Sequence, residues 1–155
     1  MLREFIVPTH KHRDLVDVTP QVHALVRAAK VRDGICLVYS PHTTAAITIN
    51  ENADPDVVSD LLGAYVDLLG DERRFEHAEG NSGAHALTSL VGPSVGIPVQ
   101  DSALVLGRWQ AIYLCEFDGP RQRTVQVQVI GDAHADLEPE SARAQLERRS
   151  PGAPS

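Results

Sequence analysis

The hydrophobic positions of this chain follow two spacings, one typical of strands and one typical of helices. Residues 123–131 give the clearest strand pattern, because valines at every second position alternate with threonine and glutamine. Shorter apolar runs predict further strands at 2–8, 34–40, 43–50, 96–100, 103–106 and 109–117. The dipeptide Asp118-Gly119, followed by Pro120, predicts a turn that joins the last two strands into a hairpin.

Three other segments repeat apolar residues at helical spacing. The first is expected over 19–30, with Thr19 as the cap before a proline, and the second over 54–70, where aspartate precedes a proline. A shorter helix is expected over 84–91. Together the elements predict an α+β fold, a mostly antiparallel β-sheet with two or three helices on one face.

The length of 155 residues fits one domain. We expect that domain to span residues 1–133, because residues 134–155 are polar, contain two late prolines and hold almost no large apolar side chains. Such a segment buries too little surface to offset the entropy lost on ordering. It is therefore predicted to be a mobile or disordered tail.

Charge narrows the function classes. The chain holds 21 acidic and 14 basic residues, and nine of the acidic ones lie in 51–79. Without a basic patch to neutralise phosphates, neither nucleic acid nor a membrane surface is an expected partner. The N-terminus shows no secretory signal and no run is long enough to span a bilayer, so a cytoplasmic location is expected.

Histidines form the first candidate site. His77 and His85 flank a glycine-containing loop with Glu79 and Asn81, and glycines allow such a loop to turn sharply. His42 lies at a proline-containing break between two predicted strands and offers a third ring. Three imidazoles with one open position are typical of a catalytic metal site. The alternative is a polar loop with surface histidines.

Two further clusters carry polar groups. His42 is followed by Thr43 and Thr44, and Glu51-Asn52 stands just before the second predicted helix, so these residues either bind a polar ligand or simply cap the helix. Glu116 and Arg121 flank the predicted turn. The arginine is either a plain salt-bridge partner of Glu116 or a bidentate grip on a phosphate or carboxylate.

Three segments, 40–60, 77–94 and 103–121, resemble the three motifs of the YjbQ family, also called the secondary thiamine-phosphate synthase enzyme family. The resemblance extends from about residue 2 to residue 132. It implies a compact α+β fold, a homotrimer with sites near subunit interfaces, and reported metal or anion occupancy in relatives. It also implies a weak activity that joins an aminopyrimidine diphosphate to a thiazole phosphate and releases pyrophosphate.

The resemblance also implies a shared polar pocket. Its members would be His42, Glu51, Asn52, His77, His85 and Glu116. The chain departs from the family pattern at two positions, since Arg108 stands in place of a threonine and Leu87 in place of the lysine found in many members.

The resulting hypothesis is a metal-dependent transferase for a small phosphorylated metabolite, in which a divalent ion, Zn or Mg, neutralises the leaving diphosphate. Its metal ligands would be His42, His77 and His85. Its catalytic residues would be Glu116, Glu51 and Arg121. Its substrate-binding residues would be Asn52, Thr43, Asn81, Ser89 and Arg121. Two alternatives remain open: a trimeric metal- or metabolite-binding protein without strong catalysis, and a metal-dependent hydrolase.

Overall fold

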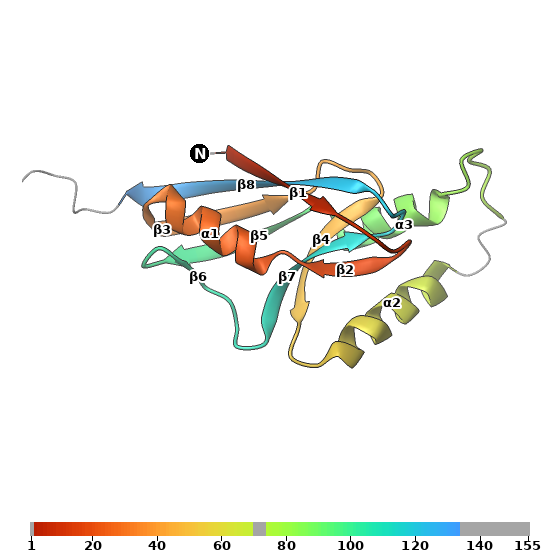
Figure 1. Ribbon diagram of the computed structural model, residues 1–155, viewed down its shortest axis with the longest axis horizontal. Helices are drawn as coiled ribbons and strands as arrows, with labels where there is room; N and C mark the ends of the chain where they lie inside the picture. The colour runs from red at the N-terminus through yellow and green to blue at the C-terminus, as the bar shows by residue number, and fades with distance from the viewer. Residues whose placement is uncertain (1, 70–73, 134–155) are drawn as a thin grey trace, which may run out of the picture.

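The computed structural model describes residues 2–69 and 74–133 (Figure 1). Its strands are β1 (Leu2–Pro8), β2 (Asp14–Asp17), β3 (Val31–Tyr39), β4 (Ala45–Glu51), β5 (Ser94–Gln100), β6 (Ala103–Leu104), β7 (Gln110–Glu116) and β8 (Gln122–Ala133). Its helices are α1 (Thr19–Ala29), α2 (Pro55–Leu69) and α3 (Ser82–Val91). Each predicted segment contains an element of the predicted type, and β2 is the strand that the sequence pattern did not predict.

The described strands form two antiparallel sheets, whereas a single sheet was predicted. The larger sheet has the order β1-β8-β3-β5-β6 and the smaller one the order β2-β7-β4. The α+β class is confirmed, since the sheets are antiparallel and α1, α2 and α3 all lie on one side of the larger sheet.

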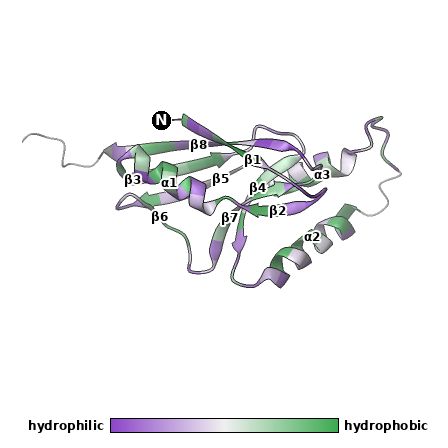
Figure 2. Ribbon diagram, in the orientation of Figure 1, coloured by the Kyte–Doolittle hydropathy of each residue, from purple (hydrophilic) through white to green (hydrophobic). Residues whose placement is uncertain are grey.

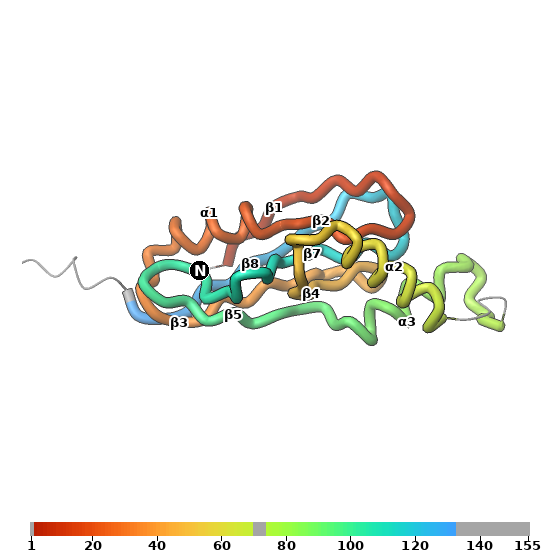
Figure 3. Tube along the Cα trace, turned by 90° about the horizontal axis from the view of Figure 1, so that it is seen from below, coloured from red at the N-terminus to blue at the C-terminus, as the bar shows by residue number. Residues whose placement is uncertain are grey.

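Three layers account for the core. The inner face of the larger sheet packs on α1 and on the smaller sheet, through fully buried valines such as Val26, Val38 and Val127. Figure 3 shows α1 running along one side of β3, β5 and β8. The other face of the smaller sheet is covered by α2 and α3, where Leu87 and Tyr113 are buried. Hydrophobic and polar positions mix along α2, as one-sided burial requires (Figure 2).

The other side of the larger sheet is called the outer face here, and no described helix covers it. Strand alternation places large apolar side chains on it. They are Leu2, Ile6, Ile35, Leu37, Tyr39 and Ile130. Each of these side chains is exposed by more than a third of its surface, so this face exposes large apolar side chains among polar ones such as Gln126 and Gln128.

The predicted closing hairpin is wrong, because β7 and β8 belong to different sheets. β7 pairs with β2 and β4, while β8 pairs with β1 and β3. Burial explains the separation: every residue from Ala111 to Glu116 is buried, so β7 must lie between two layers. β8 alternates between buried and less buried positions and therefore fits a sheet with one open face.

The predicted cap of the first helix is also corrected. Thr19 is the first helical residue, and the cap position belongs to Val18. The Thr19 hydroxyl accepts the backbone N–H of Ile112 in β7 at 2.8 Å, so it ties the helix to the smaller sheet. A tertiary contact thus takes the oxygen that a local cap would have used.

Two predictions fall on residues that the structure does not describe. The tail predicted over 134–155 and the end of the second helix at Gly70 lie outside the described residues. None of the described helices is long and apolar enough to cross a membrane.

Candidate functional site

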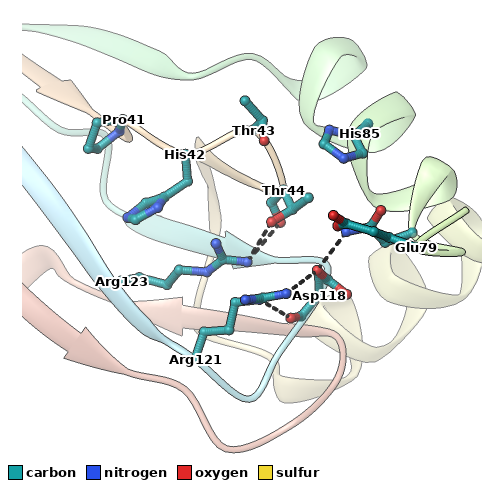
Figure 4. Close-up of a pocket in the computed structure, with 10 residues that line it drawn as sticks. Pro41, His42, Thr43, Thr44, Glu79, His85, Asp118, Arg121 and Arg123 are labelled. Carbon is teal, nitrogen blue, oxygen red and sulfur yellow. Dashed lines mark hydrogen bonds and ion pairs between the residues drawn. The ribbon is translucent and has the colours of Figure 1, made fainter. Parts of the chain in front are cut away.

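A cavity of about 320 Å³ opens where β3 leaves the larger sheet, beside the first residues of β8 (Figure 4). The loop before α3 and the start of α3 form its opposite wall. Its lining residues are Pro41, His42, Thr43, Thr44, Glu79, Asn81, His85, Asp118, Arg121 and Arg123. Half of the ten site residues predicted from the sequence line this cavity, namely His42, Thr43, Asn81, His85 and Arg121.

Arg123 forms the floor of the cavity. It continues the buried face of β8 and is only 4% exposed. Its Nε donates to Glu116 Oε2 at 2.8 Å, and its Nη2 donates to Glu116 Oε1 and, at 2.9 Å, to Thr44 Oγ1. A guanidinium held at this many points is fixed in position before any ligand arrives.

Glu116 lies behind Arg123 and is completely buried. Its oxygens also accept the hydroxyl of Thr9 and the backbone N–H of Asp118, each at 2.8 Å. Burial raises the pKa of the Glu116 carboxyl, but the hydrogen bonds from Arg123, Asp118 and Thr9 outweigh it and hold the pKa below its usual value. The structure thus places this candidate catalytic carboxylate outside the cavity lining, where it holds Arg123.

Arg121 lines the cavity from the start of β8, but it does not pair with Glu116. Its Nε donates to the backbone oxygen of Asp118 and its Nη2 to the Asp118 carboxylate, both at 2.8 Å. Asn81 Nδ2 donates to the same carboxylate at 3.0 Å. The salt bridge considered for Arg121 and Glu116 is therefore corrected: Glu116 pairs with Arg123, because that side chain shares the buried face.

His42 replaces a missing strand partner. The β3–β8 pairing ends at Tyr39 opposite Gln126, so the backbone N–H of Thr124 has no β3 residue opposite it, although β1 continues on its other side. His42 Nε2 accepts this N–H at 2.8 Å. Burial, followed by the positive charge of Arg123, lowers the pKa of His42 below its usual value.

His77 and His85 lie close together, with ring centroids 5.6 Å apart and planes at 74°. His77 Nε2 is 3.9 Å from Glu79 Oε2. In residues 2–69 and 74–133, however, no three His, Cys, Asp or Glu side chains converge to hold an ion. His42 Nε2 is also already occupied by the N–H of Thr124. The described residues therefore do not fit the expected His42, His77 and His85 metal triad.

Three other candidates lie elsewhere. Glu51 ends β4 opposite Gln110, at the end of that strand away from the cavity. Asn52 Nδ2 donates to Asp17 at 3.1 Å in an exposed pair. Ser89 Oγ donates to the backbone oxygen of His85, an ordinary contact within a helix. None of the three lines the cavity.

Sequence reasoning missed Arg123 and Asp118. A signal for Arg123 was present, since it stands two positions before Val125 and hence on the buried face of the same strand. A buried arginine requires a carboxylate partner, and Glu116 lies in the predominantly apolar strand predicted over 109–117. Asp118 was treated only as a turn residue. Leu87, in place of a lysine, is fully buried and lies outside the lining.

Comparisons with known proteins agree with this fold. A family model described as "UPF0047 protein YjbQ-like" matches residues 3–132. A UPF0047 protein of Methanocaldococcus jannaschii is 48% identical over 132 residues, covering 85% of this chain and 96% of that protein. Bacillus subtilis YugU is 44% identical, covering 84% of this chain and 100% of YugU.

Solved structures give the same result. A YjbQ/UPF0047 family protein from Clostridium acetobutylicum superposes with a TM-score of 0.79 at 45% identity, covering 83% of this chain and 99% of that one. A YbjQ-like protein of unknown function from Sulfolobus solfataricus gives a TM-score of 0.82 at 33% identity, covering 85% of this chain and 97% of that one.

Proposed function

Because this chain belongs to the YjbQ-like UPF0047 family, we propose that its cavity binds a small phosphorylated metabolite and supports a transfer reaction of the thiamine-phosphate synthase type. The observation that carries the proposal is that two guanidinium groups, of Arg121 and Arg123, line one cavity together with the hydroxyl of Thr43. Arginine presents its donors in a planar fork that matches phosphate oxygens.

The suitability of this site for a phosphorylated ligand does not come from a net positive charge. The two arginines are balanced by Asp118 and Glu116, with which they pair. The site therefore offers donors that are already oriented, and no reorganisation is needed when negative charge arrives. Figure 4 shows Arg121 and Arg123 on one side of the cavity, and His85 and Glu79 on the other.

This arrangement suits displacement of a diphosphate. In the proposed reaction a ring nitrogen of the thiazole attacks the methylene carbon of the aminopyrimidine diphosphate. A C–N bond forms, the C–O bond breaks, and the electron pair leaves with pyrophosphate. Arg121 and Arg123 stabilise the charge that develops on the leaving oxygen. His85 and Glu79 lie on the wall that would face the heterocycle, and no step of this proposal requires an ion.

The test is a binding and turnover assay on the full chain. Arg121→Ala is expected to weaken phosphate binding by about 10- to 100-fold, the effect of losing a charged hydrogen-bond donor. Arg108→Ala is the matched control, because Arg108 stacks on Trp109 at 4.7 Å and is not part of the lining. Equal phosphate affinity in Arg121→Ala and wild type would contradict the proposed anion site. If wild type releases no pyrophosphate from the two precursors, the transfer reaction is wrong.

A second candidate is a metal- or metabolite-binding protein without strong catalysis, or a metal-dependent hydrolase. The closeness of His77, His85 and Glu79 favours it, although the three do not converge as described. Metal analysis of purified wild type, His77→Ala and His85→Ala decides this case. A bound ion that both variants lose would support the metal-dependent forms of the second candidate, and the absence of stoichiometric metal would remove those forms.

The proposed assembly is a homotrimer. The apolar side chains of the outer face support it, since monomers rarely leave such a surface open. Ile35→Glu and Leu37→Glu are expected to weaken assembly, because each would bury a charge in the contact. Light scattering at micromolar concentration measures this directly, and a monomeric wild type would contradict the trimer.

A further inference from the structure

His42 is positioned by the backbone of another strand. Its Nε2 lies 2.8 Å from the N of Thr124, at the point where β3 no longer pairs with β8. A backbone N–H is a donor in every protonation state of the protein. The nitrogen facing it must therefore carry a lone pair, and the proton of the neutral ring must lie on Nδ1.

This tautomer conflicts with metal binding. A metal ion on Nδ1 would move the ring proton to Nε2, where it would face the Thr124 N–H and place two donors against each other. A metal ion on Nε2 would displace the Thr124 N–H and leave a backbone donor unsatisfied. Either arrangement breaks the contact that holds the ring.

The same tautomer leaves His42 with a hydrogen-bond donor at Nδ1. Nδ1–H is a donor in the neutral ring, and His42 lines the cavity together with Arg123. Burial, followed by the positive charge of the Arg123 guanidinium, lowers the pKa of His42 and favours the neutral ring. A neutral donor beside a fixed cation matches an anionic oxygen.

We infer that His42 is a hydrogen-bond donor, through Nδ1–H, to an anionic oxygen of the ligand, and that it is neither a metal ligand nor a general base. The oxygen belongs to a phosphoryl or carboxylate group. The ligand part of this inference rests on the proposed function, whereas the tautomer does not. The two parts can therefore fail separately.

The tautomer is read by NMR of the full chain labelled with ¹⁵N-histidine. The expected spectrum shows His42 protonated at Nδ1 and unprotonated at Nε2 at neutral pH. Adding Zn²⁺ is expected to leave both His42 nitrogens unmoved, while His77 and His85 report in the same spectrum whether zinc binds the protein. A proton on Nε2, or loss of the Nδ1–H signal on adding Zn²⁺, would overturn the inference.

The ligand part is read by titration with inorganic phosphate. The Nδ1–H signal of His42 is expected to shift on saturation. His42→Ala is expected to bind phosphate about 5- to 15-fold more weakly, from the loss of one hydrogen bond. His42→Gln can accept the Thr124 N–H and still donate, so it should bind within about threefold of wild type.

The results distinguish the donor role of His42 from the proposed anion site. If Arg121→Ala weakens phosphate binding but the His42 signal does not move, the donor role is wrong and the anion site stands. If neither variant changes phosphate binding, the proposed function fails as well. Unfolding curves of His42→Ala and His42→Gln show whether both variants are folded, and binding is compared only between folded proteins.

Discussion

The β4–β7 ladder ends in two polar clusters, and they differ in how far their charges are buried. At one end Ala45 faces Glu116, whose carboxylate is completely buried and hydrogen-bonded by Arg123. At the other end Glu51 faces Gln110, and the neighbouring Asn52 makes an exposed contact. A buried charge requires a complete set of partners, whereas an exposed one does not. The buried end therefore holds its groups rigidly beside a cavity.

The largest expected difference between the two ends is in stability. Arg123→Ala leaves Glu116 as an unpaired buried charge and is expected to lower the free energy of unfolding by about 3–5 kcal/mol. Glu51→Ala, the matched change at the other end, is expected to change it by less than about 0.5 kcal/mol. Urea denaturation measures both. Similar losses in the two variants would contradict the comparison.

A double variant sharpens this result. Replacing Arg123 with Met and Glu116 with Leu removes both charges while keeping apolar volume, and is expected to recover most of the stability lost in Arg123→Ala. A double variant as unstable as the single one would show that packing, and not the unpaired charge, causes the loss.

The second prediction concerns acid. The pKa of Glu116 lies below its usual value of 4.5, so its stabilisation is complete above that pH and is lost as pH falls through the folded-state pKa. In Arg123→Met the guanidinium is lost while the hydrogen bonds from Asp118 and Thr9 remain, so the pKa of Glu116 rises relative to wild type. The difference from the unfolded chain that drives the acid loss is thereby reduced, and the variant should lose less stability than wild type as pH falls. Urea midpoints between pH 7 and pH 3 test this flatter profile.

The smallest effect is expected for Asn52→Ala. Its bond to Asp17 is exposed at 3.1 Å, so water replaces it and the free energy of unfolding should change by less than about 0.5 kcal/mol. Thermal unfolding of Asn52→Ala, compared with Glu51→Ala and wild type, measures this change. A loss above about 2 kcal/mol would mean that this end carries a structural role of its own.

The sequence predicted the elements better than their arrangement. Val125, Val127 and Val129 marked β8 correctly, since alternation is a local signal. The prediction of the closing hairpin was wrong because a turn at Asp118 does not specify which sheet each flanking strand joins. His42 and His85 both line the cavity, but the hydrogen bond from Thr124 to His42 depends on where β3 ends, which the sequence pattern does not specify. Arg123 was not predicted as a site residue, because its pairing with Glu116 depends on both side chains being buried between the two sheets.

The outer face and the cavity are joined by a short piece of chain. Tyr39 lies on the outer face, and Pro41 and His42, just beyond it, line the cavity. Under the proposed trimer, a neighbouring copy that packs on Tyr39 also restrains the backbone that presents His42. Assembly and ligand binding would then be thermodynamically linked, each favouring the other by the same factor. Affinity measured in a dilute sample would accordingly be weaker than in a concentrated one.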